Sequence, residues 1–207
     1  KPEIVHCGVD IDEFAYQRGE RRPNSIVAVG RLDEIKGFNH LICASAELKA
    51  KGIDITCDII GDGEQRSTLE RLISDLGLES DVRLLGVMSQ DEVRRRIQQA
   101  EIFALPSIPD RNGNMDGIPV ALMEAMALGT PAISSRVSGI PELIEHRKTG
   151  WMCEPGDVFG LALGLETLLA DQDLRDRLAA AARRRIEDDF DCRKEAGKLL
   201  QLFEAAA

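Results

Sequence analysis

Two cations bracketed by glycines follow the first long apolar run of the chain. The run at residues 25–30 leads into Gly30-Arg31-Leu32-Asp33-Glu34-Ile35-Lys36-Gly37. Arg31 can donate paired hydrogen bonds to phosphate oxygens, and Lys36 adds a mobile positive charge. Gly30 lets a ligand approach the backbone, and Gly37 lets the loop turn into a helix whose N-terminus attracts anions. These residues fit a diphosphate site, and they equally fit two surface cations on a polar loop.

Two acidic residues, Asp116 and Glu124, form a second candidate group, with seven residues between them. Asp116 lies in a loop rich in proline, glycine and asparagine, and Glu124 lies on an otherwise almost wholly apolar helical stretch. A carboxylate on such a helix needs a partner, because burying an unpaired charge is costly. Two vicinal hydroxyl groups of a ribose or another sugar would provide that partner, and so would a structural ion pair with Arg or Lys. The sequence leaves both interpretations open.

The stretch Gly61-Asp62-Gly63-Glu64 follows another short apolar run. Glycine here allows close approach of a ligand such as a nucleoside, or it makes a turn in which Asp62 caps the next helix. The stretch does not complete a GxGxxG dinucleotide fingerprint, since Arg66 stands where the third glycine is required. The chain also has no GK[ST] phosphate loop. The missing fingerprint disfavours a nicotinamide-dependent dehydrogenase.

Short apolar runs alternate with amphipathic stretches along the chain, and this alternation indicates how the candidate residues are positioned. Strands are predicted at residues 25–30, 55–60, 81–85, 102–105, 131–134 and 150–153. Helices are predicted at residues 38–51, 64–76, 90–100, 120–128, 141–145, 157–170, 174–188 and 193–207. The pattern predicts an α/β fold, a Rossmann-like doubly wound parallel sheet with helices on both faces. Ligands of such sheets bind at the carboxyl ends of the strands, where most of the candidate residues fall.

The bulk composition limits the function classes. With 207 residues, 43% hydrophobic and 30% charged, the chain has the composition of a soluble globular domain. Its net charge of −10 argues against a nucleic acid partner. The five scattered cysteines and three separated histidines support neither a metal site nor a disulfide framework, and they fit a reducing cytoplasm. The run Arg183-Arg184-Arg185, with acidic residues nearby, predicts a solvated helix face rather than a contact with anionic lipid.

Taken together, the motifs resemble the group 1 family of retaining glycosyltransferases, family 4 in the usual classification. The resemblance rests on Gly30-Arg31-Leu32 with Lys36-Gly37, and on Asp116-Gly117-Ile118-Pro119 followed by Glu124-Ala125-Met126-Ala127-Leu128-Gly129-Thr130-Pro131. His6-Cys7-Gly8-Val9-Asp10 with Phe14, Ser138-Gly139-Ile140-Pro141-Glu142-Leu143-Ile144 and Gly150-Trp151 are similar to further motifs of the family. The resemblance covers nearly the whole chain. It implies the twin-Rossmann GT-B fold, of which this chain is similar to the C-terminal, donor-binding half.

The resemblance also implies a role for each matching residue. Arg31 and Lys36 match the pair that binds the donor diphosphate and stabilises the departing nucleotide. Glu124 matches the second acid of the family's E-x7-E motif, expected on the nucleotide ribose. Asp116 matches the first acid, expected near the hydroxyls of the transferred sugar, with Asp in place of the usual Glu. The backbone amides of residues around Gly117, Ile118, Pro119 and Val120 are expected to help hold sugar and phosphate.

The implied activity is transfer of a hexose from a nucleotide-diphosphate sugar to a glycan or lipid-linked acceptor, with retention of configuration and without a metal. The donor is expected to be a UDP-, GDP- or ADP-sugar, and polysaccharide biosynthesis is the expected pathway. Two alternatives remain, a nucleotide-sugar epimerase of the same fold and a non-catalytic nucleotide-binding module.

The same resemblance implies a division of the chain. We expect residues 1–24 to be a segment or linker from an N-terminal acceptor domain, and residues 25–207 to be the nucleotide-sugar-binding domain with C-terminal helices. Without that other half we expect binding but no turnover. The expected location is the cytoplasm, with peripheral membrane association of the full-length protein at the inner face as a further possibility.

Overall fold

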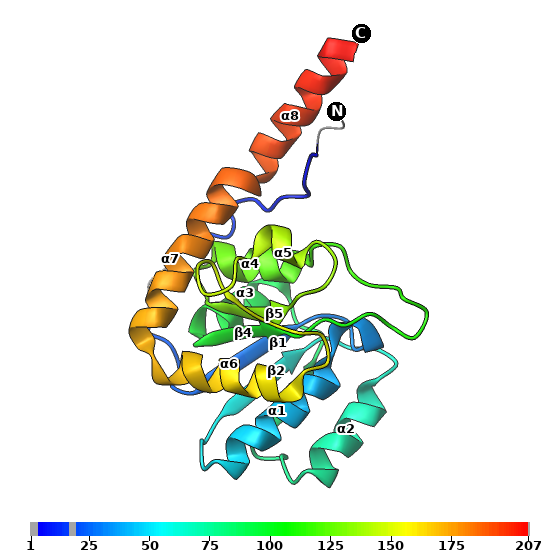
Figure 1. The fold of residues 1–207 in the computed structure, drawn as a ribbon, viewed down its shortest axis with the longest axis vertical. Helices are drawn as coiled ribbons and strands as arrows, with labels where there is room; N and C mark the ends of the chain where they lie inside the picture. The colour runs from blue at the N-terminus through cyan, green and yellow to red at the C-terminus, as the bar shows by residue number, and fades with distance from the viewer. Residues whose placement is uncertain (1–3, 17–19, 207) are drawn as a thin grey trace.

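A six-stranded parallel sheet lies at the centre of the computed structural model, in the order β3-β2-β1-β4-β5-β6 (Figure 1). The structure describes residues 4–16 and 20–206, so predictions on residues 1–3, 17–19 and 207 lie outside the described residues. The strands are β1 (Ser25–Val29), β2 (Thr56–Ile60), β3 (Val82–Gly86), β4 (Ile102–Leu105), β5 (Ala132–Ser135) and β6 (Trp151–Cys153). All six strands occur where the sequence predicts them, within a residue or two at the ends.

Helices cover both faces of this sheet. The helices α1 (Phe38–Ala50), α2 (Arg66–Asp75) and α6 (Val158–Ala170) lie below the sheet in Figure 1, and α3 (Gln90–Gln99), α4 (Val120–Ala127) and α5 (Ile140–Leu143) lie above it. A short 3-10 turn, η1 (Glu34–Lys36), precedes α1. The chain ends in α7 (Gln172–Asp189), which packs on α4, and α8 (Cys192–Ala206), which projects from the body. The predicted doubly wound α/β fold is confirmed.

The central strands are buried because helices cover both faces of the sheet; β4 is a continuous apolar run, whereas β5 ends in the buried Ser134 and Ser135. All four residues of β4 and all four of β5 are buried. The strand order reverses between β1 and β4, since β1 pairs with β2 on one side and β4 on the other. In sheets of this kind a ligand crevice opens outside the carboxyl ends of the strands at this reversal. The fold therefore places the loops after β1 and β4 at the expected binding position.

The described part of the N-terminal segment packs against the domain. Val9 exchanges backbone hydrogen bonds with Phe190 and Cys192, at 2.9 and 3.1 Å. The Phe14 side chain is only 5% exposed and joins the hydrophobic core. The guanidinium of Arg183 donates to the carbonyl oxygens of Phe14 and Ala127, at 2.7 and 2.8 Å. These contacts fasten the segment to α7 and α4, while the predicted boundary at residue 24 stays a prediction.

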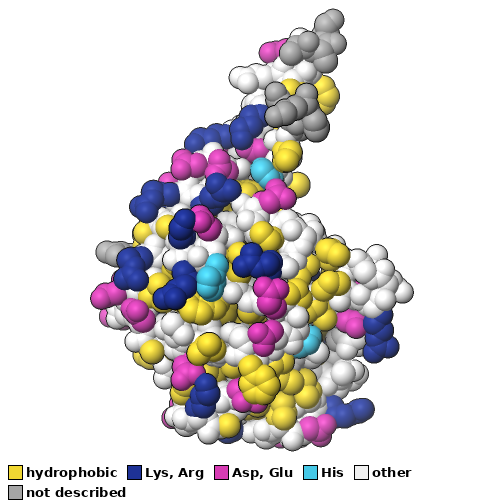
Figure 2. All heavy atoms as spheres, viewed as in Figure 1, with side chains coloured by type: hydrophobic (Ala, Val, Ile, Leu, Met, Phe, Trp, Pro, Cys, Tyr) yellow, Lys and Arg dark blue, Asp and Glu magenta, His cyan; other side chains and the backbone are white. Residues whose placement is uncertain are grey.

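Arg183 corrects one sequence interpretation. Its side chain is only 14% exposed, so it does not belong to a solvated helix face. Arg184 is exposed and fits the interpretation, and Arg185 is partly exposed beside Asp189. Figure 2 shows Lys and Arg side chains interleaved with Asp and Glu along the projecting C-terminal helices. The surface there is of mixed charge rather than uniformly basic.

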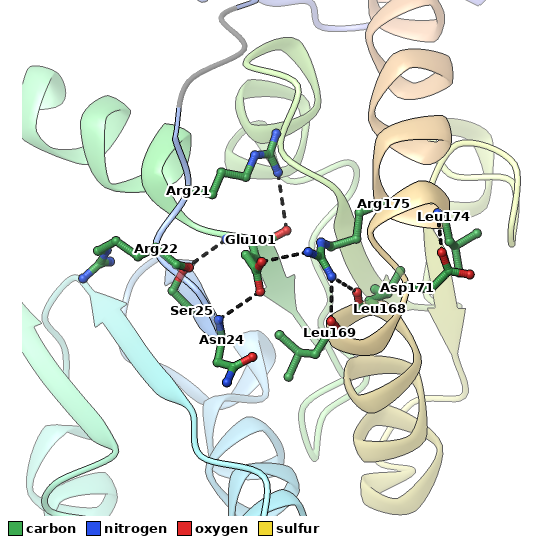
Figure 3. A network of polar contacts seen from close by, with 10 residues as sticks. All are labelled: Arg21, Arg22, Asn24, Ser25, Glu101, Leu168, Leu169, Asp171, Leu174 and Arg175. Carbon is green, nitrogen blue, oxygen red and sulfur yellow. Dashed lines mark hydrogen bonds and ion pairs between the residues drawn. The ribbon is translucent and has the colours of Figure 1, made fainter.

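A polar network closes the opposite, amino-terminal edge of the sheet (Figure 3). The guanidinium of Arg175 donates to the Leu169 carbonyl oxygen at the end of α6 and to the Glu101 carboxylate, both at 2.7 Å. Glu101 in turn accepts from the backbone N–H of Asn24, just before β1, at 2.9 Å. The network ties the start of β1 and β4 to the corner between α6 and α7. It stabilises the fold far from the loops that carry the candidate site.

Candidate functional site

Three loops meet through their backbones at the carboxyl edge of the sheet. A Cβ atom on Gly61 would collide with the carbonyl oxygen of Gly30, and one on Gly37 would collide with that of Pro106. Both glycines also have a positive φ, of 138° and 65°, which other residues rarely adopt. The loops after β1, β2 and β4 can therefore pack closely only with glycine at these two positions.

The close packing brings two predicted site residues together. The ammonium of Lys36, at the end of η1, donates to the Asp116 carboxylate at 2.6 Å, although 80 residues separate them in the chain. Their side chains are only 15% and 20% exposed. The pair is therefore a shielded charge contact at the sheet edge and not two independent surface groups.

Arg31 stands beside this pair with most of its side chain in solvent. The side chain is 74% exposed, and its Nε donates to Asp33 Oδ2 at 2.7 Å. This hydrogen bond, together with the charge of Asp33, raises the pKa of the Arg31 guanidinium. Glu64 and Asp116 act in the same direction. No residue in the described ranges uses the two terminal nitrogens of Arg31, so they are available for a bidentate contact with phosphate.

The loop after β4 leads into the N-terminus of α4 with open space above it. A Cβ atom on Gly117 would have no heavy atom within 4 Å beyond its chain neighbours. Ile118 packs instead against Gly139 of the loop before α5. Pro119 precedes the helix, and the side chain of Val120, its first residue, is 52% exposed. The first backbone N–H groups of a helix have no partner within it, so this end can receive an anion.

Glu124 lies one turn into α4 and is partly buried. Burial raises the pKa of its carboxyl, the Glu13 carboxylate adds to the increase, and Arg94 opposes it. Arg94 is itself held by Glu13 at 2.7 Å and lies over the Phe14 ring at 5.1 Å. No group in residues 4–16 or 20–206 donates a hydrogen bond to the Glu124 carboxylate, so the structural ion pair is not formed there.

The sequence reasoning missed an apolar hollow at the ends of β1, β2 and β3. Val87, Met88 and Val93 line one side of it, and Gly30 and Gly61 line the other, around a volume of about 240 Å³. Val87 is 80% exposed, so its apolar side chain is accessible to a ligand at the edge of the hollow. The sequence signal for it is the apolar pair Val87-Met88, which follows Gly86 just beyond the strand predicted at residues 81–85. This hollow and Arg31 share the same loop, which places an apolar wall next to a cation.

Within residues 4–16 and 20–206, no group of three or more His, Cys, Asp or Glu side chains is arranged to hold a metal ion. None of the helices in these ranges has the length and apolar character that crossing a membrane requires.

Comparison with known proteins identifies relatives by sequence. The family model described as glycosyl transferases group 1 matches residues 10–185. The amylovoran biosynthesis glycosyltransferase AmsK of Erwinia amylovora is 38% identical over 209 aligned positions, covering 100% of this chain and 51% of that protein. The putative colanic acid biosynthesis glycosyltransferase WcaL of Escherichia coli is 37% identical, covering 97% of this chain and 51% of its own. The chain thus spans about half the length of these relatives.

Solved structures share the fold. Anabaena Alr3699/HepE in complex with UDP superposes with a TM-score of 0.84 at 21% identity, over 98% of this chain and 57% of that one. The C-terminal domain of a group 1 family glycosyl transferase, LpcC from Francisella tularensis, superposes with a TM-score of 0.75 at 22% identity. That match covers 87% of this chain and 97% of the LpcC domain.

Proposed function

Because the chain belongs to the group 1 glycosyltransferases, we propose that it is the nucleotide-sugar-binding half of a retaining enzyme. The proposed reaction transfers a hexose from a nucleotide-diphosphate sugar to a glycan or lipid-linked acceptor. The observation that carries the proposal is the shielded Lys36–Asp116 pair at 2.6 Å, next to Arg31 and the open N-terminus of α4. Cations and helix amides for a diphosphate thus lie beside an acid suited to sugar hydroxyls.

The proposed chemistry follows from the charges that develop when a sugar–phosphate bond breaks. As the bond between the anomeric carbon and the diphosphate oxygen breaks, the sugar ring becomes positive and the departing diphosphate takes the electron pair. The acceptor's hydroxyl oxygen bonds to the anomeric carbon, and its proton passes to the departing diphosphate. Arg31, Lys36 and the first amides of α4 are placed to stabilise that negative charge. Asp116 accepts hydrogen bonds from hydroxyl groups of the transferred sugar and shares Lys36 with the diphosphate. No residue is assigned as a nucleophile, and no metal is invoked.

The nucleoside is proposed to bind between the apolar hollow and the Glu124 side chain. Its base would rest on Val87 and Met88, and the Glu124 carboxylate, to which no described residue donates a hydrogen bond, would accept from the ribose hydroxyls. UDP is the first nucleotide to test, because HepE was solved with UDP and with UDP-glucose. GDP is the second, because a GDP-mannose-dependent mannosyltransferase of Mycolicibacterium smegmatis is 30% identical. ADP completes the set.

The pathway and the rest of the protein are part of the same proposal. The named roles of AmsK and WcaL support a place in polysaccharide biosynthesis. The chain spans about half the length of its relatives, which fits a second domain that carries the acceptor site. The projecting part of α8 exposes Leu199, Leu200 and Phe203. All five cysteines are free thiols, which fits a cytoplasmic protein. Peripheral membrane association of the full-length enzyme stays a proposal.

Calorimetric titration with UDP, GDP and ADP tests the donor site directly. We expect saturable binding of one nucleotide and clear weakening in Lys36→Ala and Glu124→Ala. Lys148→Ala is the matched control, since Lys148 is 71% exposed and pairs with Glu145. Binding that is equally strong in all three variants would place the nucleotide elsewhere and overturn the site.

Turnover separates the remaining alternatives. The full-length protein with donor and acceptor should release the nucleotide and form a glycoside that keeps the donor's anomeric configuration, read by NMR. A nucleotide-sugar epimerase would change the sugar without acceptor, and a non-catalytic module would bind the donor and form no product. Detectable transfer by this half alone would contradict the expectation of binding without turnover.

A further inference from the structure

A second cavity lies next to the later part of the loop after β1 and has no lining residue in common with the apolar hollow. It occupies about 530 Å³ between η1, the start of α1 and the start of α2, a volume in the range of small-molecule sites. Phe38, Leu69 and Ile108 form its apolar wall. In Figure 1 the long loop between β4 and α4 projects on the same side of the molecule as α2. The cavity uses none of the residues assigned to the donor above.

The polar lining of this cavity suits a ligand rich in hydroxyl groups. Asn39, Gln65 and Thr68 contribute two amides and a hydroxyl, which together donate and accept hydrogen bonds. Sugar hydroxyls likewise donate and accept, and an apolar wall suits the C–H face of a sugar ring. An anion is disfavoured, because the rim cation Arg111 is 91% exposed and faces the Glu34 carboxylate at 3.5 Å.

Asp33 lies in the loop after β1 that carries Arg31, and it also lines this cavity. Its side chain is only 10% exposed and lines the cavity, and its Oδ2 accepts from Arg31 at 2.7 Å. Its other oxygen, Oδ1, has no hydrogen-bond partner among the described residues. Buried polar atoms without partners are uncommon in folded proteins. Because Asp33 lines the cavity and also binds Arg31, its carboxylate connects the cavity to the proposed donor site.

We propose that this cavity binds a neutral sugar unit of a glycan chain. The choice of a sugar rests on the proposed function, and the position rests on the lining by Asn39, Gln65 and Thr68. A glycan held here would lie next to the loop that carries Arg31. The donor itself would not occupy the cavity, because its diphosphate is drawn to Arg31, Lys36 and the start of α4.

NMR titration of the ¹⁵N-labelled chain with methyl α-D-glucopyranoside and with maltotriose tests this proposal. We expect saturable shifts at the amides of Asn39, Gln65 and Thr68. Gln65→Ala should weaken binding about fivefold, as the loss of one neutral hydrogen bond would do. Gln90→Ala is the matched control, because Gln90 is an exposed glutamine at the start of α3. Tighter binding of the trisaccharide would identify a chain, and equal binding would identify a single sugar unit.

A second variant, Thr68→Arg, keeps the proposal testable if Gln65→Ala fails to fold. Thr68 is exposed on α2, so Thr68→Arg should fold normally while its long side chain fills the cavity and abolishes the shifts. Saccharide shifts that stay unchanged in both cavity variants, or that are absent at tens of millimolar, would overturn the proposal. Titration of the same sample with UDP, GDP and ADP separates the two ideas. Nucleotide binding without saccharide binding refutes only the cavity, and the reverse refutes only the donor site.

Discussion

Asp116→Asn and Lys36→Met should change the affinity for a free nucleoside diphosphate in opposite directions. In the structure the Lys36 ammonium is bound to the Asp116 carboxylate at 2.6 Å, and both side chains are largely shielded from water. A bound diphosphate has to share that ammonium with the carboxylate and to tolerate the carboxylate's charge. Asn keeps the shape of Asp116 and removes the charge, whereas Met keeps the length of Lys36 and removes the cation.

The expected magnitudes follow from the contacts that each variant removes. A hydrogen bond to a charged group contributes about 1.5–3 kcal/mol, so Lys36→Met should weaken binding by about 10- to 150-fold. A carboxylate about 6 Å from a phosphate charge costs roughly 1–3 kcal/mol at effective dielectric constants between about 20 and 60. Asp116→Asn should recover only the lower end of this repulsion energy, about 1 kcal/mol, which corresponds to about fivefold tighter binding. The rest is not recovered because the Lys36 side chain, once released from Asp116, also loses order.

Calorimetry with whichever nucleoside diphosphate binds, run beside thermal unfolding of each variant, measures both effects. Weaker binding in Asp116→Asn with an unchanged melting temperature would refute the competition, and would show that Lys36 needs its partner for orientation. The sugar nucleotide provides an internal check. Asp116→Asn should lose affinity for the intact donor relative to the free diphosphate, since the contact with the transferred sugar is lost.

Three further predictions concern single residues. Burial raises the pKa of Glu124, and only its ionised form accepts from two ribose hydroxyls, so affinity for UDP-glucose should fall as pH falls through that raised pKa. Glu124→Gln should bind weakly at every pH and lose this dependence; an unchanged pH profile would assign the titration to another group. Gly61→Ala should cost about 2–4 kcal/mol of unfolding free energy, or roughly 5–15 °C in Tm, through strain and a backbone collision. Gly52→Ala, where φ is also positive but the space is open, should cost only about 1 kcal/mol. Arg183→Met should lower the unfolding free energy by about 2–4 kcal/mol by removing charged hydrogen bonds to backbone carbonyls. Equal losses in the exposed control Arg184→Met, measured in urea, would refute that role.

Sequence alone predicted the sheet because its signals are local. A strand buried on both faces is a short continuous apolar run, as in residues 102–105, which Pro106 ends. The order of strands and helices then restricts the topology to a parallel sheet covered on both faces. The family also followed from the spacing of Gly30, Lys36, Asp116 and Glu124, and the match over residues 10–185 confirms it.

The parts that sequence missed depend on contacts between distant segments. Nothing local to Arg183 distinguishes it from its neighbour Arg184, yet only Arg183 faces the carbonyls of Phe14 and Ala127. The surroundings of Glu124 were equally inaccessible, because Glu13 comes from the N-terminal segment and Arg94 from α3. Charge type and helical position are readable one residue at a time. The direction in which a side chain points at a distant backbone is not.

The glycines of the site show how one residue type can serve a function indirectly. The sequence leaves open whether Gly61 allows close approach of a nucleoside or makes a turn, and in the structure it lines the apolar hollow. Yet the position its Cβ would take is occupied by the Gly30 carbonyl oxygen, and the corresponding position at Gly37 is occupied by the Pro106 carbonyl oxygen. Room for a ligand cannot be the reason for glycine where protein already fills that room. The glycines instead hold three loops close enough for the Lys36 ammonium to reach the Asp116 carboxylate. The same close packing sets the spacing between the cation and the acid that a diphosphate sugar would have to span.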